Sequence, residues 1–381
     1  MKKKLLFLFF STCINVIFGQ NITIIDSIKK GKYGVGFKNL LIHDYSRTYD
    51  NSKKYRQIEL TIWYPASKSN KNKSLTYKDY VKLFHEDTLA AIKEFKKQPL
   101  EYGASDQLLN NILSAKCLAS KGIKPLKGSF PLILFAPGVS EKSYSNAILF
   151  EMLASNGYIV ASTSFLSAFS SKVIDAPRIF IEPQIRDLEF ILSYMKDFKN
   201  VDFENIGIIG HSAGGNSALL MSLRNFNIDA VALLDASFIG MENINDFSYF
   251  NPKYLRTPFL HFISGYWRKK KKMHENFNNS FFQGIKRSDA YMLDMYDLLH
   301  QSFVSDMHLR FDNSGIDYKK LGLSFDEDMS DKSYQLISDT LLNFFNIYLK
   351  KQKIDFEKEL KSSKKNFPNF FDYEGKFNNK K

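Results

Sequence analysis

The chain has 381 residues, 44% of them hydrophobic, and its formal net charge is +13. This is more than a minimal domain needs, and it is enough for one large α/β domain or for two smaller ones. A positive balance alone would allow a nucleic-acid or an anionic-membrane partner, so the placement of the charge has to decide.

The first residues are typical of an export signal. Three lysines follow Met1, the apolar run LLFLFFSTCINVIF comes next, and Gly19 precedes Gln20. We expect residues 1–19 to be a signal peptide cleaved near Gly19, which would make the mature protein periplasmic or secreted. An N-terminal membrane anchor is the alternative, although the run is shorter than the ~20 residues that span a bilayer. Cleavage would leave Cys117 as the single thiol and exclude an internal disulfide.

The remaining basic residues are clustered. Arg268–Lys272 is an unbroken basic run, and residues 350–381 carry ten lysines against five acids. We interpret both as solvated segments, and the export signal argues against a nucleic-acid partner. Peripheral contact with an anionic membrane stays open.

Strand-like and helix-like patterns alternate from about residue 57. Strands are predicted at 57–65, 130–138, 158–164, 205–212, 229–237, 257–265 and 289–296. Helices are predicted at 77–95, 105–121, 146–157, 177–198, 213–226 and 332–349. This alternation predicts an α/β fold with a mostly parallel central sheet and helices on both faces. Residues 75–127 look like a helical insertion that could cover a site, and 352–381 look like a loosely ordered, lysine-rich tail.

The stretch IGIIGHSAGGNSALLM, residues 206–221, raises the central question of function. It places Ser212 between Gly210 and Gly214, where a strand ends and a helix begins. In a nucleophile elbow this turn strains the serine backbone, and side chains at the two glycines would collide with neighbouring backbone. The Ser212 hydroxyl would then stand at the positive end of the following helix. A tight turn without chemistry is the alternative.

A nucleophilic serine needs a histidine to take its proton, and on this kind of fold the base comes last along the chain. His300 follows the last predicted strand and is the preferred base; His308 is the reserve. The other histidines are less suitable, because two precede the serine, one is expected to point away from the elbow, one lies mid-strand and one follows the basic run. They are His43 and His85, His211, His261, and His274.

A carboxylate must orient that histidine. Asp235 closes an apolar strand, where packing alone hardly explains a charged group. Asp294 and Asp297 compete but lie on or beside the strand that leads to His300. For the oxyanion, Gly138 lets the chain turn after a strand, so the N–H groups of Val139 and Ala213 are the predicted donors.

Four segments, FAPGVS, GHSAGG, LLDASF with TPFLHFIS, and HQSF, occur in an order that resembles the platelet-activating-factor acetylhydrolase group. This group is a branch of the α/β-hydrolases related to the dienelactone hydrolases, and the similarity covers roughly residues 31–350. It implies a cofactor-free serine esterase acting on short or oxidised acyl esters. It also implies Ser212 as nucleophile, Asp235 as acid and His300 as base. We expect an α/β-hydrolase domain over 20–351, no metal ion, and short-acyl phospholipids or other lipid esters among the substrates.

The sequence departs from that group at Pro137, where many members have histidine, and at Ser140, where a second glycine is common. A non-catalytic binding protein on the same fold remains an alternative, as does a lipase or peptidase with the same triad. A metal hydrolase is not supported, because no His-Glu-x-x-His or clustered ligand spacing occurs. The acyl group, the alcohol and the oligomeric state are left open.

Overall fold

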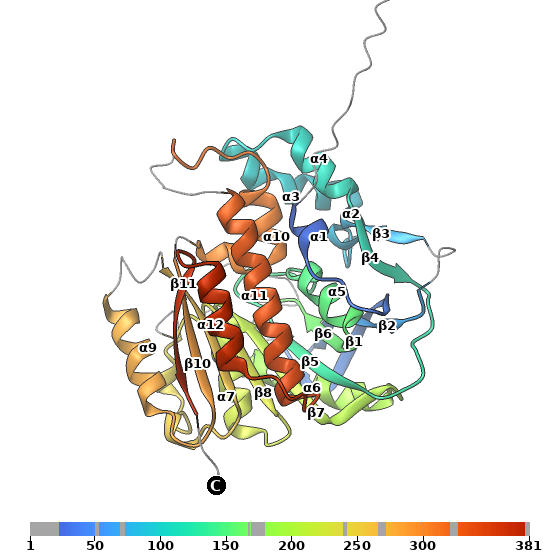
Figure 1. Ribbon diagram of the computed structural model, residues 1–381. Helices are drawn as coiled ribbons and strands as arrows, with labels where there is room; N and C mark the ends of the chain where they lie inside the picture. Colours follow the sequence, from blue (N-terminus) through green and yellow to red (C-terminus); the bar gives the residue numbers. More distant parts are fainter. Residues whose placement is uncertain are drawn as a thin grey trace, which may run out of the picture.

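The computed structural model describes residues 23–49, 53–68, 73–166, 168, 180–238, 242–265, 272–296, 298–320 and 327–377. The strands are β1 (Gly34–Thr48), β2 (Tyr55–Ala66), β3 (Ser74–Thr76), β4 (Lys116–Lys121), β5 (Phe130–Ala136), β6 (Ile159–Thr163), β7 (Val201–His211), β8 (Ala230–Leu234), β9 (Phe259–Ser264), β10 (Ala290–Met295) and β11 (Phe371–Lys376). They form one sheet in the order β11-β10-β9-β8-β7-β5-β6-β2-β1-β4-β3 (Figure 1).

The helices lie between these strands. They are α1 (Thr23–Ser27), α2 (Tyr77–Val81), α3 (Thr88–Glu101), α4 (Asp106–Ser114), α5 (Ala147–Ser155), α6 (Ile181–Tyr194), α7 (Ala213–Arg224), α9 (Lys272–Gly284), α10 (Ser305–Met307), α11 (Glu327–Tyr348) and α12 (Phe356–Asn366). A short 3₁₀ helix follows β10 at His300–Phe303, and a π-helical turn covers His308–Asp312.

The centre of the sheet is parallel, as the sequence predicts. Neighbouring strands from β6 through β5, β7, β8 and β9 to β10 all run in the same direction, and β2 joins β6 in the opposite direction. Parallel strands need cover on both faces, and every residue of β8 is accordingly buried. Because side chains alternate along a strand, Leu132 and Leu134 of β5 enter one core while Ile133 enters the other.

Each face of the sheet has its own helices. The core around Ile133 contains residues of α1, α5, α11 and the insertion, and the core around Leu132 contains residues of α6, α7 and α9. In Figure 1, α11 and α12 cross one face of the sheet and α2, α3 and α4 gather beyond one end of the strands. The helices of the insertion therefore lie toward one end of the strands, while some of its side chains pack into the core around Ile133.

The insertion is only partly helical. The predicted helix over 105–121 is wrong in its second half, because α4 ends at Ser114 and Lys116–Lys121 form β4, parallel to β1. Pairing with a distant strand overrides the helical spacing there. Buried Glu151 of α5 holds the insertion, since its carboxyl group accepts hydrogen bonds from the Leu118 N–H at 2.8 Å and from the Tyr80 hydroxyl at 2.6 Å. Burial raises the pKa of Glu151 to about 7.

The expectation of a loosely ordered tail after residue 352 is also wrong. Residues 356–366 form α12, and β11 pairs antiparallel with β10 at the edge of the sheet. Phe356 and Phe371 are buried, and the Phe356 ring lies 4.6 Å from that of Tyr291, centre to centre. Apolar anchors spaced along a lysine-rich sequence thus extend the domain beyond residue 351 and cover an open strand edge.

Two of the predicted segments lie outside the described residues. The signal peptide at 1–19 is one, and Arg268–Lys271 of the basic run is the other. Within the described ranges, no helix combines the length and the apolar character needed to cross a bilayer.

Candidate active site

Ser212 stands at the turn between β7 and α7. Its backbone has φ 54° and ψ −124°, a conformation that a non-glycine residue adopts only under strain. A Cβ atom at Gly210 would lie 2.4 Å from the Gly214 carbonyl oxygen, and one at Gly214 would lie 2.1 Å from that of Ala136. Both positions therefore exclude a side chain, and the strained turn is held by close backbone packing.

Three side chains from different strand ends meet at this turn. The Ser212 hydroxyl lies 2.9 Å from His300 Nε2, and His300 Nδ1 lies 2.5 Å from Asp235 Oδ2. Asp235 Oδ1 accepts a second hydrogen bond, from the Ser264 N–H at 2.9 Å. Because Nδ1–H donates to Asp235, Nε2 of His300 is free to accept the proton of the Ser212 hydroxyl. This is the tautomer that a base for Ser212 requires.

Asp235 is held in its charged form. Burial raises its pKa, but the hydrogen bond and charge of His300 and the Ser264 N–H lower it more, so that the pKa falls below its usual value. Asp235 also has φ 47°, which turns its side chain out of β8. Of its two competitors, Asp294 is buried within β10, and Asp297 lies outside the described residues.

The reserve base, His308, is engaged elsewhere. It is fully buried, and its Nε2 lies 2.6 Å from Asp331 while its Nδ1 lies 3.3 Å from Asp312. Burial lowers its pKa, but the two carboxylates raise it more. His261 is buried mid-strand, as expected, and accepts a hydrogen bond from the Ala236 N–H at 3.2 Å.

The remaining histidines have no contact with Ser212 in the described part of the chain. His43 lies beside Gln57 on β1, and His85 lines the cavity described below. The side chain of His274, in α9, is outside the described residues.

The loop after β5 approaches Ser212 closely. A Cβ atom at Gly138 would lie 2.9 Å from the Ser212 Cβ, so only glycine allows this approach. The loop turns through a hydrogen bond from the Glu141 N–H to the Gly138 carbonyl at 3.2 Å, and Ser140 has φ 66°, a conformation that glycine adopts more readily. Val139 faces the cavity, and Ala213 is the first residue of α7, so its N–H has no acceptor within the helix.

Pro137 does not disturb this loop. Its carbonyl accepts a hydrogen bond from the buried side chain of Gln184 in α6 at 2.9 Å. The loop is thus fixed from below by a helix, and its backbone N–H groups after Pro137 are kept.

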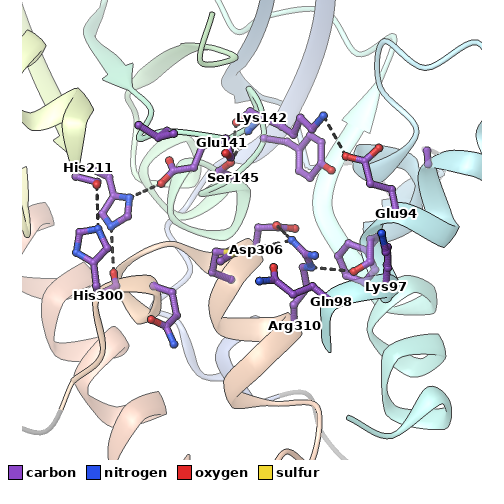
Figure 2. A pocket seen from close by; sticks show the side chains of 18 of the residues that line it. Glu94, Lys97, Gln98, Glu141, Lys142, Ser145, His211, His300, Asp306 and Arg310 are labelled. Atoms are coloured by element: carbon purple, nitrogen blue, oxygen red, sulfur yellow. Dashed lines mark hydrogen bonds and ion pairs between the residues drawn. The ribbon is translucent and has the colours of Figure 1, made fainter. Parts of the chain in front are cut away.

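The expectation that His211 points away from the site is wrong. Its Nδ1 contacts Glu141 Oε1, its Nε2 lies 3.1 Å from the His300 carbonyl oxygen, and its ring centre lies 4.9 Å from that of His300 (Figure 2). A carbonyl oxygen only accepts hydrogen bonds, so Nε2 of His211 carries a proton and donates a hydrogen bond to the His300 carbonyl. The other ring nitrogen, Nδ1, faces the Glu141 carboxyl group. Burial lowers the pKa of His211, but Glu141 raises it more.

Sequence reasoning missed both Glu141 and Ser237. The Ser237 hydroxyl lies 3.3 Å from that of Ser212, and Glu141 Oε2 is buried without a hydrogen-bond partner. A glutamate three residues after the turn glycine was the available signal for the Glu141–His211 pair.

Ser212 and His300 open into a cavity of about 800 Å³. Its walls come from the loop after β5, from α3 of the insertion and from the segment after His300. Figure 2 shows His211 and His300 at one end, Lys142 and Glu94 toward the other, and Asp306 and Arg310 between them. Several of these charges are paired, with Lys142 3.5 Å from Glu94 and Arg310 3.3 Å from Asp306. The cavity is therefore polar without a large excess of either charge.

A search of solved structures gives a match over most of the chain. A ferulic acid esterase from Streptomyces cinnamoneus has a TM-score of 0.63 at 19% identity, with 87% of this chain and 94% of that one covered. At this identity the similarity shows the fold. The chain has the α/β-hydrolase fold.

Sequence comparisons agree with this assignment. A family model for chlorophyllases matches residues 120–253 of this chain. Chlorophyllase type 0 of Chenopodium album is 26% identical over 152 residues, which are 36% of this chain and 43% of that protein. The match thus spans less than half of the relative. The region matched by the family model contains the loop after β5 and the elbow. Together the comparisons confirm the predicted fold and show sequence similarity to chlorophyllases over part of the chain; the resemblance to the platelet-activating-factor acetylhydrolase group stays a prediction.

Proposed function

We propose that this α/β-hydrolase is an exported serine esterase that cleaves carboxylic esters through an acyl-enzyme. The observation that carries the proposal is the continuous line from Ser212 Oγ through His300 to Asp235, with distances of 2.9 and 2.5 Å. In this line Ser212 is the nucleophile, His300 the general base and Asp235 the group that orients it.

Acylation begins when Ser212 Oγ attacks the ester carbonyl carbon and its proton passes to His300 Nε2. The carbonyl electron pair moves onto oxygen, where the N–H groups of Val139 and Ala213 stabilise it. Asp235 stabilises the imidazolium that forms. The bond to the alcohol oxygen then breaks, and His300 returns the proton to the leaving alcohol.

Deacylation repeats the sequence with water. His300 takes a proton from water, the resulting nucleophile attacks the acyl carbon, and the bond to Ser212 Oγ breaks as the proton returns to the serine. No cofactor or metal ion is needed for this chemistry, and no described group of three acidic, histidine or cysteine side chains is placed to hold a metal.

Short-acyl esters are the proposed substrates, with short-acyl phospholipids and other lipid esters among them, as the predicted resemblance implies. The charged walls of the cavity support a short acyl group, because a long alkyl chain would have to displace water from Lys97, Lys142 and Glu101. The degradation of lipids as a physiological role stays a prediction.

The decisive experiment is to treat the purified mature protein with a fluorophosphonate and map the labelled peptide. We expect the label on Ser212, hydrolysis of p-nitrophenyl esters that falls with acyl length, and no loss of activity in EDTA. Folded protein that is neither labelled nor active would favour the non-catalytic binding alternative, and a label at another serine would contradict the assigned nucleophile.

Export is a separate part of the proposal, supported by the lysine and apolar pattern before Gly19. Mass analysis of periplasmic or secreted protein should find an N-terminus near Gln20. Soluble cytoplasmic protein that keeps Met1 would contradict it. Contact of the basic segments with an anionic membrane stays a prediction.

A further inference from the structure

A second pocket adjoins the cavity at Ser212 and has a different character. It has a volume of about 460 Å³ and is lined by Gln98, Tyr102, Gln301, Met307, Phe311, Ile316 and Tyr318. Three of these residues, Gln98, Gln301 and Met307, also line the cavity at Ser212. The two spaces therefore adjoin, and the second differs from the first because none of its lining side chains is charged.

The floor of this pocket is a small apolar cluster separate from the two main cores. It contains Leu299, Phe311, Ile316 and Tyr318, each less than a tenth exposed. The Tyr318 hydroxyl lies 2.9 Å from the buried Asp312 side chain, which leaves its ring as a fixed wall. Rigid aromatic walls of this kind are typical of pockets that bind apolar groups.

Two elements lie between the pockets, and in each of them two successive residues line different pockets. In the π-helical turn, Arg310 lines the cavity at Ser212 while Phe311 lines the second pocket. At the end of α3, Glu101 and Tyr102 divide in the same way. The Arg310 guanidinium joins both elements through a 2.9 Å hydrogen bond to the Phe95 carbonyl. Single-turn π-helical segments are rare in proteins overall, and those that occur often lie at functional sites.

We propose that the second pocket binds an apolar, ring-sized group in the alcohol part of the ester, an assignment that rests on the proposed esterase function. The chemistry of His300 favours the alcohol part over the acyl part. His300 must protonate the leaving alcohol oxygen, so the alcohol lies beside the imidazole. Gln301, the next residue along the chain, lines both spaces, and we place the path of the alcohol group past its side chain. The preferred substrate is thus an ester of a short acid with an aromatic or branched apolar alcohol.

The test uses four esters that move one ring between the two sides of the bond. Benzyl acetate is compared with ethyl acetate, and methyl phenylacetate with methyl acetate, by kcat/KM in a pH-stat. For the wild type we expect benzyl acetate to be preferred over ethyl acetate on the order of tenfold or more, because the ring is removed from water. Methyl phenylacetate should gain much less over methyl acetate.

Two variants then locate the ring. Phe311→Ala enlarges the pocket and Ile316→Phe fills it, and each should lower the benzyl-to-ethyl ratio by about tenfold. Phe226→Ala is the matched control, because Phe226 is 82% exposed and lies beyond the far end of α7 from Ser212. It should keep the wild-type ratio. If Phe311→Ala does not fold, Ile316→Phe still decides.

The outcomes are distinguishable. If folded Ile316→Phe keeps the wild-type ratio of benzyl acetate to ethyl acetate, the second pocket does not bind the ring. If instead the wild type prefers methyl phenylacetate and the variants remove that preference, the pocket binds the acyl group and not the alcohol. Folded wild type that cleaves none of the four esters and takes no fluorophosphonate label would overturn the proposed function itself, and the subsite with it.

Discussion

The carboxyl end of the sheet and the cover above it differ in how they hold their side chains. Ser212 and Asp235 directly follow β7 and β8, and His300 comes a few residues after β10, so the parallel strands β7 to β10 bring the three residues to the same end of the sheet. The cover consists of α3 and the segment 307–318, which come from distant parts of the sequence and meet through contacts such as that of Arg310 with the Phe95 carbonyl.

Under the proposed function, the strand ends carry out the ester cleavage and the cover sets which substrates bind. The strand ends are fixed by the sheet, and their geometry survives changes in the cover, as expected for catalytic groups on a rigid scaffold. The cover determines the shape and charge of the space around the substrate. Changes at the strand ends should therefore act on the rate, and changes in the cover on stability or substrate choice.

The largest effect is expected at the strand ends. Ser212→Ala or His300→Ala should lower kcat/KM for a p-nitrophenyl ester by about 10³-fold or more without unfolding the protein, and Asp235→Asn should cost as much or less. The double variant Asp235→Asn/His300→Ala should be little worse than His300→Ala, because the groups act as a unit. Additive losses would mean that the two side chains work independently.

His308, eight residues beyond His300, should affect stability instead. His308→Gln removes a buried imidazole from between Asp312 and Asp331, and breaking such a buried pair costs about 3–5 kcal/mol. Urea unfolding should show this loss, while kcat/KM per folded molecule should change little. Unchanged stability with abolished activity would make His308 the base.

The stability of the protein should depend on pH through the buried His261, which lies close to Asp235. Burial lowers its pKa to about 4, so between about pH 6.5 and 4 the unfolded chain binds a proton that the folded chain does not. The unfolding free energy should fall by up to about 3 kcal/mol over this range from this residue. In His261→Asn this component should be absent. Equal profiles for wild type and His261→Asn would contradict it.

Glu141 connects the loop after β5 with His300, and its effect should be the smallest. Glu141→Gln should lower kcat about tenfold, or ~1.4 kcal/mol, with little change in KM, because His211 would hold the His300 backbone less firmly. The exposed Glu204→Gln is the control for loss of a charge. A change in KM alone would indicate that Glu141 contacts the substrate and does not position the base.

A single histidine shows the limit of sequence reasoning. The choice of His300 over His308 depended on where a strand ends, a local pattern, whereas the burial of His308 depends on Asp331 in α11. The orientation of His211 was mispredicted for the same reason. Its partner, Glu141, lies 70 positions away, and no periodicity reports such a contact.

By itself the sequence determined the α/β alternation, the strand ends and the position of Ser212 between two glycines, because hydrophobic period and turn sterics act over a few residues. Tertiary structure decided that 116–121 and 371–376 are strands, since their pairing with β1 and β10 outweighs local preference. It also decided the two pockets and the Glu141–His211 pair, because these require side chains far apart in sequence to meet in one place.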